Sequence, residues 1–124
     1  MSESQLFQAK YDLIIIGAGT SGAYLARLAV EKGYSVLVTE KKSKEETGNK
    51  YDIFHIEEKE FSQLGIPRPV DGDPEWAFEF EKNYNTDPEN LYPKLQINPI
   101  VGLHLHEYTL LLNELAIKAG AVII

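Results

Sequence analysis

The amino-acid sequence predicts an α/β fold in which a parallel strand–helix–strand unit is followed by an antiparallel hairpin and a further helix–strand step. Two short apolar runs, Leu13–Ile16 and the Val-Leu-Val within residues 35–39, lie on either side of a segment with helical periodicity. In the middle of the chain, a segment alternates between apolar and polar residues. At the C-terminal end of the chain, a segment with helical periodicity is followed by a glycine and an apolar run. Because a strand–helix–strand connection is almost always parallel and right-handed, these observations indicate a parallel sheet.

The composition fits one globular domain and disfavours several classes of protein. Among 124 residues, 12 lysines and arginines stand against 19 aspartates and glutamates, a net charge of −7 that disfavours a nucleic-acid partner. The absence of cysteine excludes a disulfide framework and a cysteine-ligated metal. No apolar run is long enough for a signal sequence or a transmembrane segment. We therefore expect a cytoplasmic protein.

The N-terminal part of the chain predicts two buried strands and a helix. Residues 1–10 are polar and are expected to form a flexible leader. The apolar run that ends before Gly17 is typical of a strand buried on both faces of a parallel sheet. Residues 20–32 have helical spacing, with Gly33 placed to end the helix. Residues 35–39 then predict a second buried strand.

The middle of the chain predicts a smaller antiparallel element. Residues 41–50 are charged and are expected to form a surface loop. Residues 57–64 predict a short helix that ends at Gly65. Residues 75–81 alternate between aromatic and acidic side chains, as a half-buried strand does, and residues 94–105 predict its hairpin partner.

The C-terminal part predicts one more helix and one more strand. Residues 107–119 have helical spacing, and Gly120 separates them from the apolar run at residues 121–124. This third strand is expected to lie outside the second, which gives the strand order 3-2-1. Since no later segment covers its other face, we expect residues 11–124 to be the N-terminal part of a longer domain.

A glycine-rich motif lies between the first strand and the first helix. It consists of Gly17, Ala18, Gly19, Thr20, Ser21 and Gly22. Its G-x-G-x-x-G pattern in this position is the Rossmann-type fingerprint for a dinucleotide. The first glycine permits a sharp turn, the second lets a pyrophosphate approach the backbone, and the third lets the helix pack closely on the strand. The helix N-terminus then offers N–H groups and a positive dipole end to the phosphates.

Glu40 ends the second strand, where a carboxylate can accept hydrogen bonds from an adenosine ribose. A carboxylate there also repels a 2′-phosphate, so FAD or NAD is favoured over NADP. The alternatives are a glutamate that faces water and a glycine motif that serves only as a strand-to-helix turn.

Residues 11–27 and 33–41 together resemble the N-terminal FAD-binding segment of flavoprotein oxidoreductases. More narrowly, they are similar to the geranylgeranyl-reductase-like branch, which is related to the aromatic hydroxylases and the halogenases. The resemblance implies that residues 11–22 hold the pyrophosphate of FAD, that Glu40 holds the ribose, and that Lys41 lies near the adenosine. It also implies a second sheet over the flavin ring, so residues 75–105 are expected to form a substrate-side hairpin.

The function implied by this resemblance is the transfer of hydride or electrons through a flavin to an unsaturated or apolar small molecule. A nicotinamide donor, NADH or NADPH, would bind only transiently, because the chain has no second fingerprint. By itself the chain is expected to be inactive. The alternatives are an FAD-dependent monooxygenase or halogenase, a non-catalytic module that binds ADP or a dinucleotide, and a fragment of an NAD-dependent dehydrogenase.

His104 and His106 form a His-x-His sequence, which on a strand would place both imidazoles on one face. They could contact the flavin or the substrate, begin a metal site, or have an ordinary structural role. No third ligand is evident in the sequence, so no metal site is predicted, and no catalytic residue is assigned.

Overall fold

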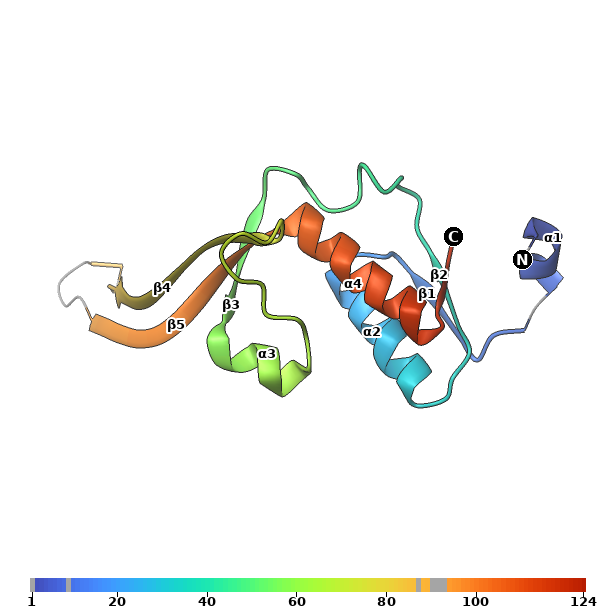
Figure 1. Cartoon of the computed structure of the whole chain (residues 1–124), viewed down its shortest axis with the longest axis horizontal. Helices are drawn as coiled ribbons and strands as arrows, with labels where there is room; N and C mark the ends of the chain where they lie inside the picture. The colour runs from blue at the N-terminus through green and yellow to red at the C-terminus, as the bar shows by residue number, and fades with distance from the viewer. Residues whose placement is uncertain (1, 9, 87, 90–93) are drawn as a thin grey trace. The chain divides into compact units, whose positions relative to one another are not determined.

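The computed structural model describes residues 2–8, 10–86, 88–89 and 94–124 (Figure 1). Two compact units divide the chain. The first, here called the parallel unit, comprises Met1–Gly48 and Tyr108–Ile124. The second, here called the antiparallel unit, comprises Asn49–Glu107. The predicted α/β fold is confirmed, with one three-stranded sheet in each unit.

The sheet of the parallel unit has the order β1-β2-β6, in which all strands are parallel. Its strands are β1 (Leu13–Ile16), β2 (Val36–Thr39) and β6 (Val122–Ile123). The last strand therefore lies beside the second and not beside the first. This is the predicted 3-2-1 order, the usual one for the first three strands of a Rossmann-type sheet.

Two helices pack on one face of this sheet. They are α2 (Thr20–Glu31) and α4 (Leu105–Ala119), of which the part from Tyr108 onward belongs to the parallel unit. Figure 1 shows α2 and α4 side by side. Small residues line the contact, since Ala26 and Ala116 are fully buried in one core cluster with Val38 of β2. Alanines at these positions let the helices approach the sheet closely.

The prediction that β1 is buried on both faces is wrong. Ile15 is 8% exposed, whereas Ile14 and Ile16 on the opposite face are 59% and 90% exposed. Side chains of a strand alternate between the two faces, and in the described part of the chain the helices cover only the face of Ile15. The continuous apolar run did predict a strand, but not which of its faces is covered.

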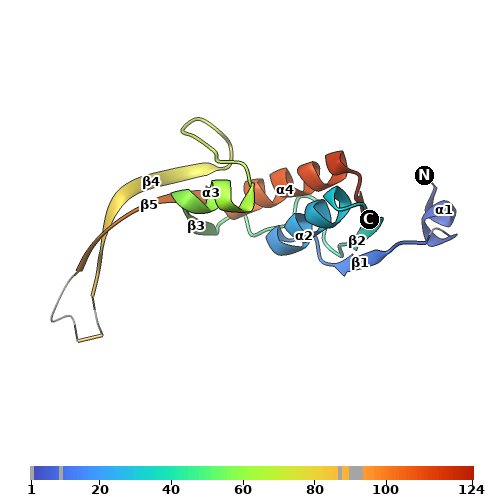
Figure 2. The same ribbon diagram turned by 90° about the horizontal axis from the view of Figure 1, so that it is seen from below.

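The antiparallel unit contains a sheet with the order β3-β5-β4. Its strands are β3 (Ile53–Glu57), β4 (Trp76–Asn85) and β5 (Lys94–His104). Strands β4 and β5 form the predicted hairpin and run side by side along their length (Figures 1 and 2). Strand β4 is longer than predicted, and β3 was not predicted at all, because five residues give too little alternation to identify a strand.

Helix α3 (Glu58–Leu64) confirms the short helix predicted in the antiparallel unit. Glu57 and Glu60 cap its N-terminus reciprocally, and Gly65 ends it in the left-handed conformation, with φ of 63°. In the adjoining sheet, the ring of Phe78 on β4 packs directly on Gly102 of β5. Because glycine has no side chain, the ring can lie this close to the backbone of β5.

The N-terminal leader contains a short helix, α1 (Glu3–Gln8), which the sequence analysis did not predict. The expected flexibility of residues 1–10 stays a prediction. In the part of the chain that the structure describes, none of the helices is long and apolar enough to cross a membrane.

Candidate functional site

The candidate site is the turn that connects β1 to α2. Gly17 leaves β1 with a positive φ of 101°, a conformation that glycine adopts at no steric cost. Its N–H donates a hydrogen bond of 2.7 Å to the carbonyl of Thr39 on β2, so the turn is held at the C-terminal ends of both strands. This edge of a parallel sheet is where such folds bind ligands.

The other two glycines of the motif have different surroundings. A Cβ atom on Gly22 would lie 2.0 Å from the carbonyl oxygen of Gly17, so only glycine lets α2 pack this closely on the turn. A Cβ atom on Gly19 would meet no heavy atom within 4 Å. The third glycine therefore serves packing, and the second leaves open space beside the backbone, as the motif predicts.

The N-terminus of α2 is accessible to an anion, because no side chain caps it and no acidic side chain lies in its first turn. Gly19 occupies the N-cap position and has no side chain to cap the helix, and the first turn of α2 contains no acidic residue. The first N–H groups of a helix lack partners within the helix and carry a partial positive charge. The 12-residue helix therefore presents these groups at the glycine turn.

Glu40 lies just after β2 and its carboxylate holds the glycine turn. One oxygen, Oε2, accepts a hydrogen bond of 2.7 Å from the N–H of Ala18, and Oε1 accepts one of 2.9 Å from the N–H of Lys42. The N–H of Ala18, followed by that of Lys42, holds the pKa of this carboxyl below its usual range. Glu40 is therefore ionised at neutral pH and fixed beside the turn.

Asn113 on α4 contacts the same turn and was missed by the sequence analysis. Its Nδ2 donates hydrogen bonds of 2.8 Å to the carbonyl of Ala18 and of 2.8 Å to that of Thr109. Its Oδ1 is buried and has no hydrogen-bond partner in the described structure. The available signal was an amide that directly follows three leucines, at positions 110–112, within a helix.

A cavity of about 300 Å³ lies beside the turn, within the parallel unit. It combines an apolar wall from α4 and β6 with the charged groups of the loop that follows β2. Its lining consists of Ala18, Glu40, Lys42, Lys44, Thr47, Leu110, Asn113, Glu114, Ile117, Ile123 and Ile124. An apolar wall with a few polar groups at one end is typical of a site for a small ligand.

The structure brings most of the predicted site residues together, but Lys41 does not line the cavity. The glycine motif and Glu40 meet at the C-terminal edge of the parallel sheet. Lys41 is exposed, and the lysines that line the cavity are Lys42 and Lys44. The role of Lys41 near an adenosine stays a prediction.

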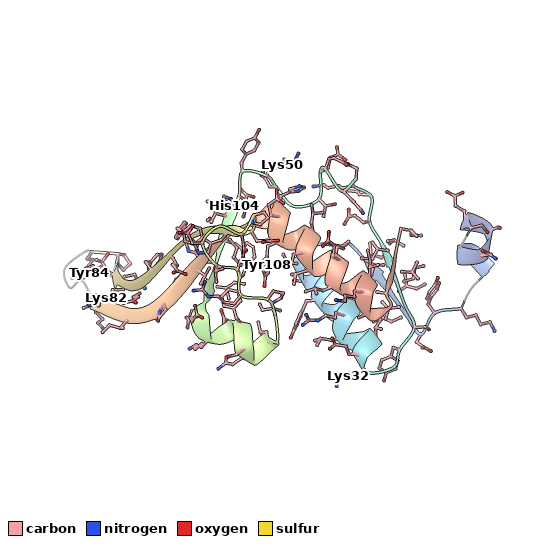
Figure 3. All side chains as sticks on the ribbon, in the orientation of Figure 1. Lys32, Lys50, Lys82, Tyr84, His104 and Tyr108 are labelled. Atoms are coloured by element: carbon pink, nitrogen blue, oxygen red, sulfur yellow. The ribbon has the colours of Figure 1, made fainter. Side chains whose placement is uncertain are left out.

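The two histidines do not lie on one face of a strand, so that expectation is wrong. His104 is the last residue of β5, and His106 lies in the first turn of α4, because the chain changes from strand to helix between them. They line a cavity of about 400 Å³ in the antiparallel unit together with Lys50, Pro74 and Glu107. Figure 3 labels two of these residues, Lys50 and His104. Among the described residues, no three His, Cys, Asp or Glu side chains are placed to hold a metal ion.

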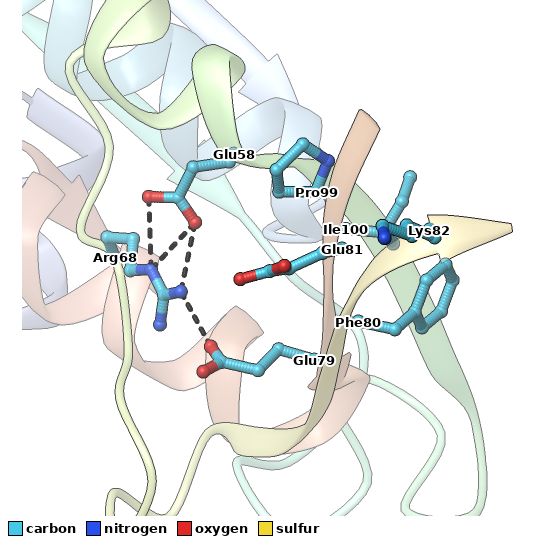
Figure 4. Close-up of a pocket in the computed structure, with 8 residues that line it drawn as sticks. All are labelled: Glu58, Arg68, Glu79, Phe80, Glu81, Lys82, Pro99 and Ile100. Atoms are coloured by element: carbon cyan, nitrogen blue, oxygen red, sulfur yellow. Dashed lines mark hydrogen bonds and ion pairs between the residues drawn. The ribbon is translucent and has the colours of Figure 1, made fainter. Parts of the chain in front are cut away.

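A second charged cluster lies in the antiparallel unit, where Arg68 links Glu58 of α3 to Glu79 of β4 (Figure 4). Its Nη2 lies 2.9 Å from Glu58 Oε2 and 2.6 Å from Glu79 Oε2, and its Nη1 donates to the carbonyl of Pro69. The hydrogen bond to Arg68 lowers the pKa of the Glu79 carboxyl. Since this guanidinium already binds two carboxylates and a carbonyl, it ties the segment after α3 to the sheet.

Comparison with known protein families and sequences finds two matches, each over part of the chain. Residues 15–57 match the model of the NAD(P)-binding Rossmann-like domain. Over 33 residues the chain is 52% identical to a digeranylgeranylglycerophospholipid reductase of Methanospirillum hungatei, a match that covers 27% of this chain and 8% of the reductase.

Solved structures share the fold over nearly the whole chain. A geranylgeranyl bacteriochlorophyll reductase-like protein from Thermoplasma acidophilum superposes with a TM-score of 0.69 at 21% identity, over 91% of this chain and 29% of that protein. The flavin-dependent brominase Bmp2 superposes with a TM-score of 0.67 at 20% identity, over 92% and 29% of the two chains. Halogenase PltM in complex with phloroglucinol and FAD gives a TM-score of 0.63 at 19% identity, over 94% and 28%.

These comparisons confirm the Rossmann-type fold and the resemblance to the geranylgeranyl-reductase-like and halogenase flavoproteins. The chain spans less than a third of each of these relatives. At identities below a quarter, the solved structures establish the shared fold and not a shared reaction.

Proposed function

We propose that this chain is the FAD-binding part of a flavin-dependent oxidoreductase of the geranylgeranyl-reductase-like branch. The observation that carries the proposal is the glycine turn, in which the open N-terminus of α2 and the ionised Glu40 meet at one edge of the parallel sheet. The fold shared with FAD-dependent enzymes supports the choice of cofactor.

The residues present fit the ADP half of FAD. The open space at Gly19 leaves room for a pyrophosphate against the backbone, where Thr20 and Ser21 add the first N–H groups of α2. We assign residues 17–22 to phosphate binding. The adjoining cavity of about 300 Å³, with its apolar wall, offers a place for the adenosine.

Glu40 would bind the ribose and discriminate among dinucleotides. Its oxygens accept backbone hydrogen bonds from Ala18 and Lys42, and the N–H of Lys41 also acts on the carboxylate. Since a carboxylate has about four acceptor positions, it retains one for a ribose hydroxyl. Because the carboxylate is ionised, a 2′-phosphate placed there would be repelled. Glu40 therefore favours FAD, or NAD as the second choice, over NADP.

FAD, when bound, would supply hydride or electron transfer, and the chain would contribute binding, orientation and electrostatics. We propose the hairpin within residues 75–105 as the substrate-facing part and an unsaturated or apolar small molecule as the substrate. NADH or NADPH would be the transient donor. The 33-residue match to a lipid reductase supports reduction over halogenation or hydroxylation.

A second candidate is a non-catalytic module that binds ADP or the ADP half of a dinucleotide. One observation favours it: the turn, Glu40 and the cavity all lie in the parallel unit. This unit could therefore bind an ADP group whether or not a flavin ring is attached. The two candidates differ in whether this chain retains a flavin.

The test is to incubate the purified chain with FAD, remove free ligand by gel filtration, and record the visible absorption spectrum. A retained flavin spectrum supports the flavoprotein. A colourless chain whose melting temperature rises with ADP supports the ADP-binding module. A colourless chain on which ADP has no effect contradicts both candidates.

The substitution Gly19→Glu provides the matched control. A side chain and a negative charge would occupy the space left for the pyrophosphate, although nothing in the free chain lies within 4 Å of the new Cβ. We expect this variant to fold and to lose binding of both FAD and ADP. Undiminished binding would exclude the glycine turn as the phosphate site.

A further inference from the structure

We propose that Asn113 is a positioning residue for the glycine turn, which it holds so that the N–H of Gly19 is presented to the ligand's phosphates. This inference rests on the proposed function, because it assigns a role in the same nucleotide site to a residue of α4. Neither the fingerprint motif nor the match over residues 15–57 includes this helix.

The orientation of the Asn113 amide is fixed by its contacts. Nδ2 donates to the carbonyl of Ala18 and to that of Thr109, both at 2.8 Å, so both of its hydrogens are engaged. The N–H of Ala18 donates to Glu40. Both backbone polar groups of Ala18, which is 2% exposed, are therefore held by side chains from distant parts of the sequence.

This anchoring determines the direction of the next N–H group. In a planar trans peptide, the carbonyl of Ala18 and the N–H of Gly19 point in opposite directions. Because Asn113 binds the carbonyl, the N–H of Gly19 faces away from α4. Gly19 is exposed and has open space beside it, so this N–H lies on the side left for a ligand.

Two features of Asn113 are unfavourable for the stability of the free protein. Its Oδ1 is buried without a hydrogen-bond partner in the described structure, which is unfavourable. Asparagine also has a lower helix propensity than leucine, the residue at positions 110, 111 and 112. A residue that served only the packing of α4 would be apolar, so the amide is better explained by its hold on the turn.

The test compares Asn113→Leu with the unaltered chain in titrations with ADP and with adenosine. ADP carries the two phosphates that the turn would bind, and adenosine lacks them. We expect Asn113→Leu to weaken ADP binding about tenfold, the effect of losing one well-oriented hydrogen bond, and adenosine binding less than about twofold. The melting temperature of the free chain should change by less than about 4 °C.

Lys118→Gln is the control, since Lys118 is an exposed residue of α4 that does not line the cavity. This variant should bind ADP no more weakly than the unaltered chain. Equal ADP binding by Asn113→Leu and the unaltered chain would overturn the role of Asn113 and leave the proposed function intact. Equal weakening for ADP and adenosine would also overturn it, because Asn113 would then act through the cavity and not through the turn. If the unaltered chain bound no ADP, the proposed function itself would fail.

Asn113→Asp keeps the inference testable if the leucine variant does not fold. The carboxylate has nearly the same shape as the amide but cannot donate to the carbonyl of Ala18. We expect it to fold and to bind ADP at least tenfold more weakly, about the effect expected for leucine. Normal ADP binding by this variant would overturn the role of the Nδ2 donor.

Discussion

The two units of this chain hold their backbones together by different means. In the parallel unit, the glycine turn is fixed by backbone groups and by two polar side chains, Glu40 and Asn113, that bind the backbone. In the antiparallel unit, the segment after α3 is tied down by ion pairs between side chains, centred on Arg68. Close packing on glycine occurs in both units, against backbone at Gly22 and against an aromatic ring at Gly102.

This difference predicts which kind of substitution destabilises each unit. A backbone carbonyl cannot move without displacing a strand or a helix, whereas a side chain can adopt another rotamer. Hydrogen bonds between a side chain and the backbone are also less sensitive to salt than ion pairs near the surface. We therefore expect the parallel unit to be sensitive to changes of shape, and the antiparallel unit to be more sensitive to changes of charge and salt.

The largest expected effect comes from Gly22→Ala in the parallel unit. The new Cβ would lie 2.0 Å from the carbonyl oxygen of Gly17, so α2 has to shift away from the turn. We expect a loss of about 3 kcal/mol in the free energy of unfolding, measured by urea denaturation, together with the loss of ADP binding. Gly19→Ala is the control and should change stability by less than about 0.5 kcal/mol. Similar losses for the two variants would contradict the close packing at Gly22.

Gly102→Ala is the corresponding change in the antiparallel unit. The new Cβ would lie 2.6 Å from Cζ of Phe78, and the ring can move where a carbonyl cannot. We expect a loss of about 1 kcal/mol in the free energy of unfolding, smaller than that for Gly22→Ala. In the double variant with Phe78→Leu, the two losses should be less than additive, because the smaller side chain makes room for the methyl group. Strict additivity would show that the two residues do not interact.

Arg68→Met tests the ion pairs of the antiparallel unit. It removes the contacts to Glu58 and Glu79 and leaves two unpaired carboxylates, although both are partly exposed. We expect a loss of about 1 kcal/mol in the free energy of unfolding at low salt, and less than half of that in about 0.5 M NaCl. Urea denaturation at both salt concentrations measures this. A loss that does not change with salt would indicate that Arg68 acts mainly through its packing.

The smallest expected effect concerns acid stability. The folded protein lowers the pKa of Glu40 and of Glu79 below the usual 4.5, so each carboxylate stabilises the fold above that pH. This stabilisation is lost as the pH falls from 4.5 through the lower folded values. Melting temperatures of Glu40→Gln and Glu79→Gln should therefore fall less steeply with acid than that of the unaltered chain.

Salt distinguishes the two carboxylates in the same experiment. Glu40 accepts hydrogen bonds from backbone N–H groups, whereas Glu79 pairs with a guanidinium. In about 0.5 M NaCl, the effect of Glu79→Gln should shrink and that of Glu40→Gln should remain. An equal response of both variants to salt would contradict the difference between the two units.

Much of the fold could be predicted because its signals are local. The motif from Gly17 to Gly22 combines a turn residue, a close approach and a helix start within six positions. The strand order followed from the usual order of the Rossmann-type sheet, which the glycine motif predicts. Strand β3 and the exposed face of β1 could not be predicted, because they depend on which distant segment lies alongside.

The candidate site divides in the same way. The position of Glu40 at a strand end predicted a carboxylate at the glycine turn, and the structure adds its bond to Ala18. Asn113 lies 95 positions from Ala18 in the sequence, and no local pattern joins the two residues. Arg68 likewise meets Glu79 only because the segment after α3 folds back beside β4.

The sequence by itself determined the strand–helix–strand order, the glycine turn and the carboxylate at the end of β2. Backbone conformation and periodicity act over a few residues, so composition and spacing are enough to specify them. Only the tertiary structure decided which side chains hold that turn in place, which face of β1 is covered, and which carboxylates Arg68 binds. These contacts join separate elements, which for Asn113 and Ala18 lie 95 positions apart, and such pairings follow from the packing of whole elements.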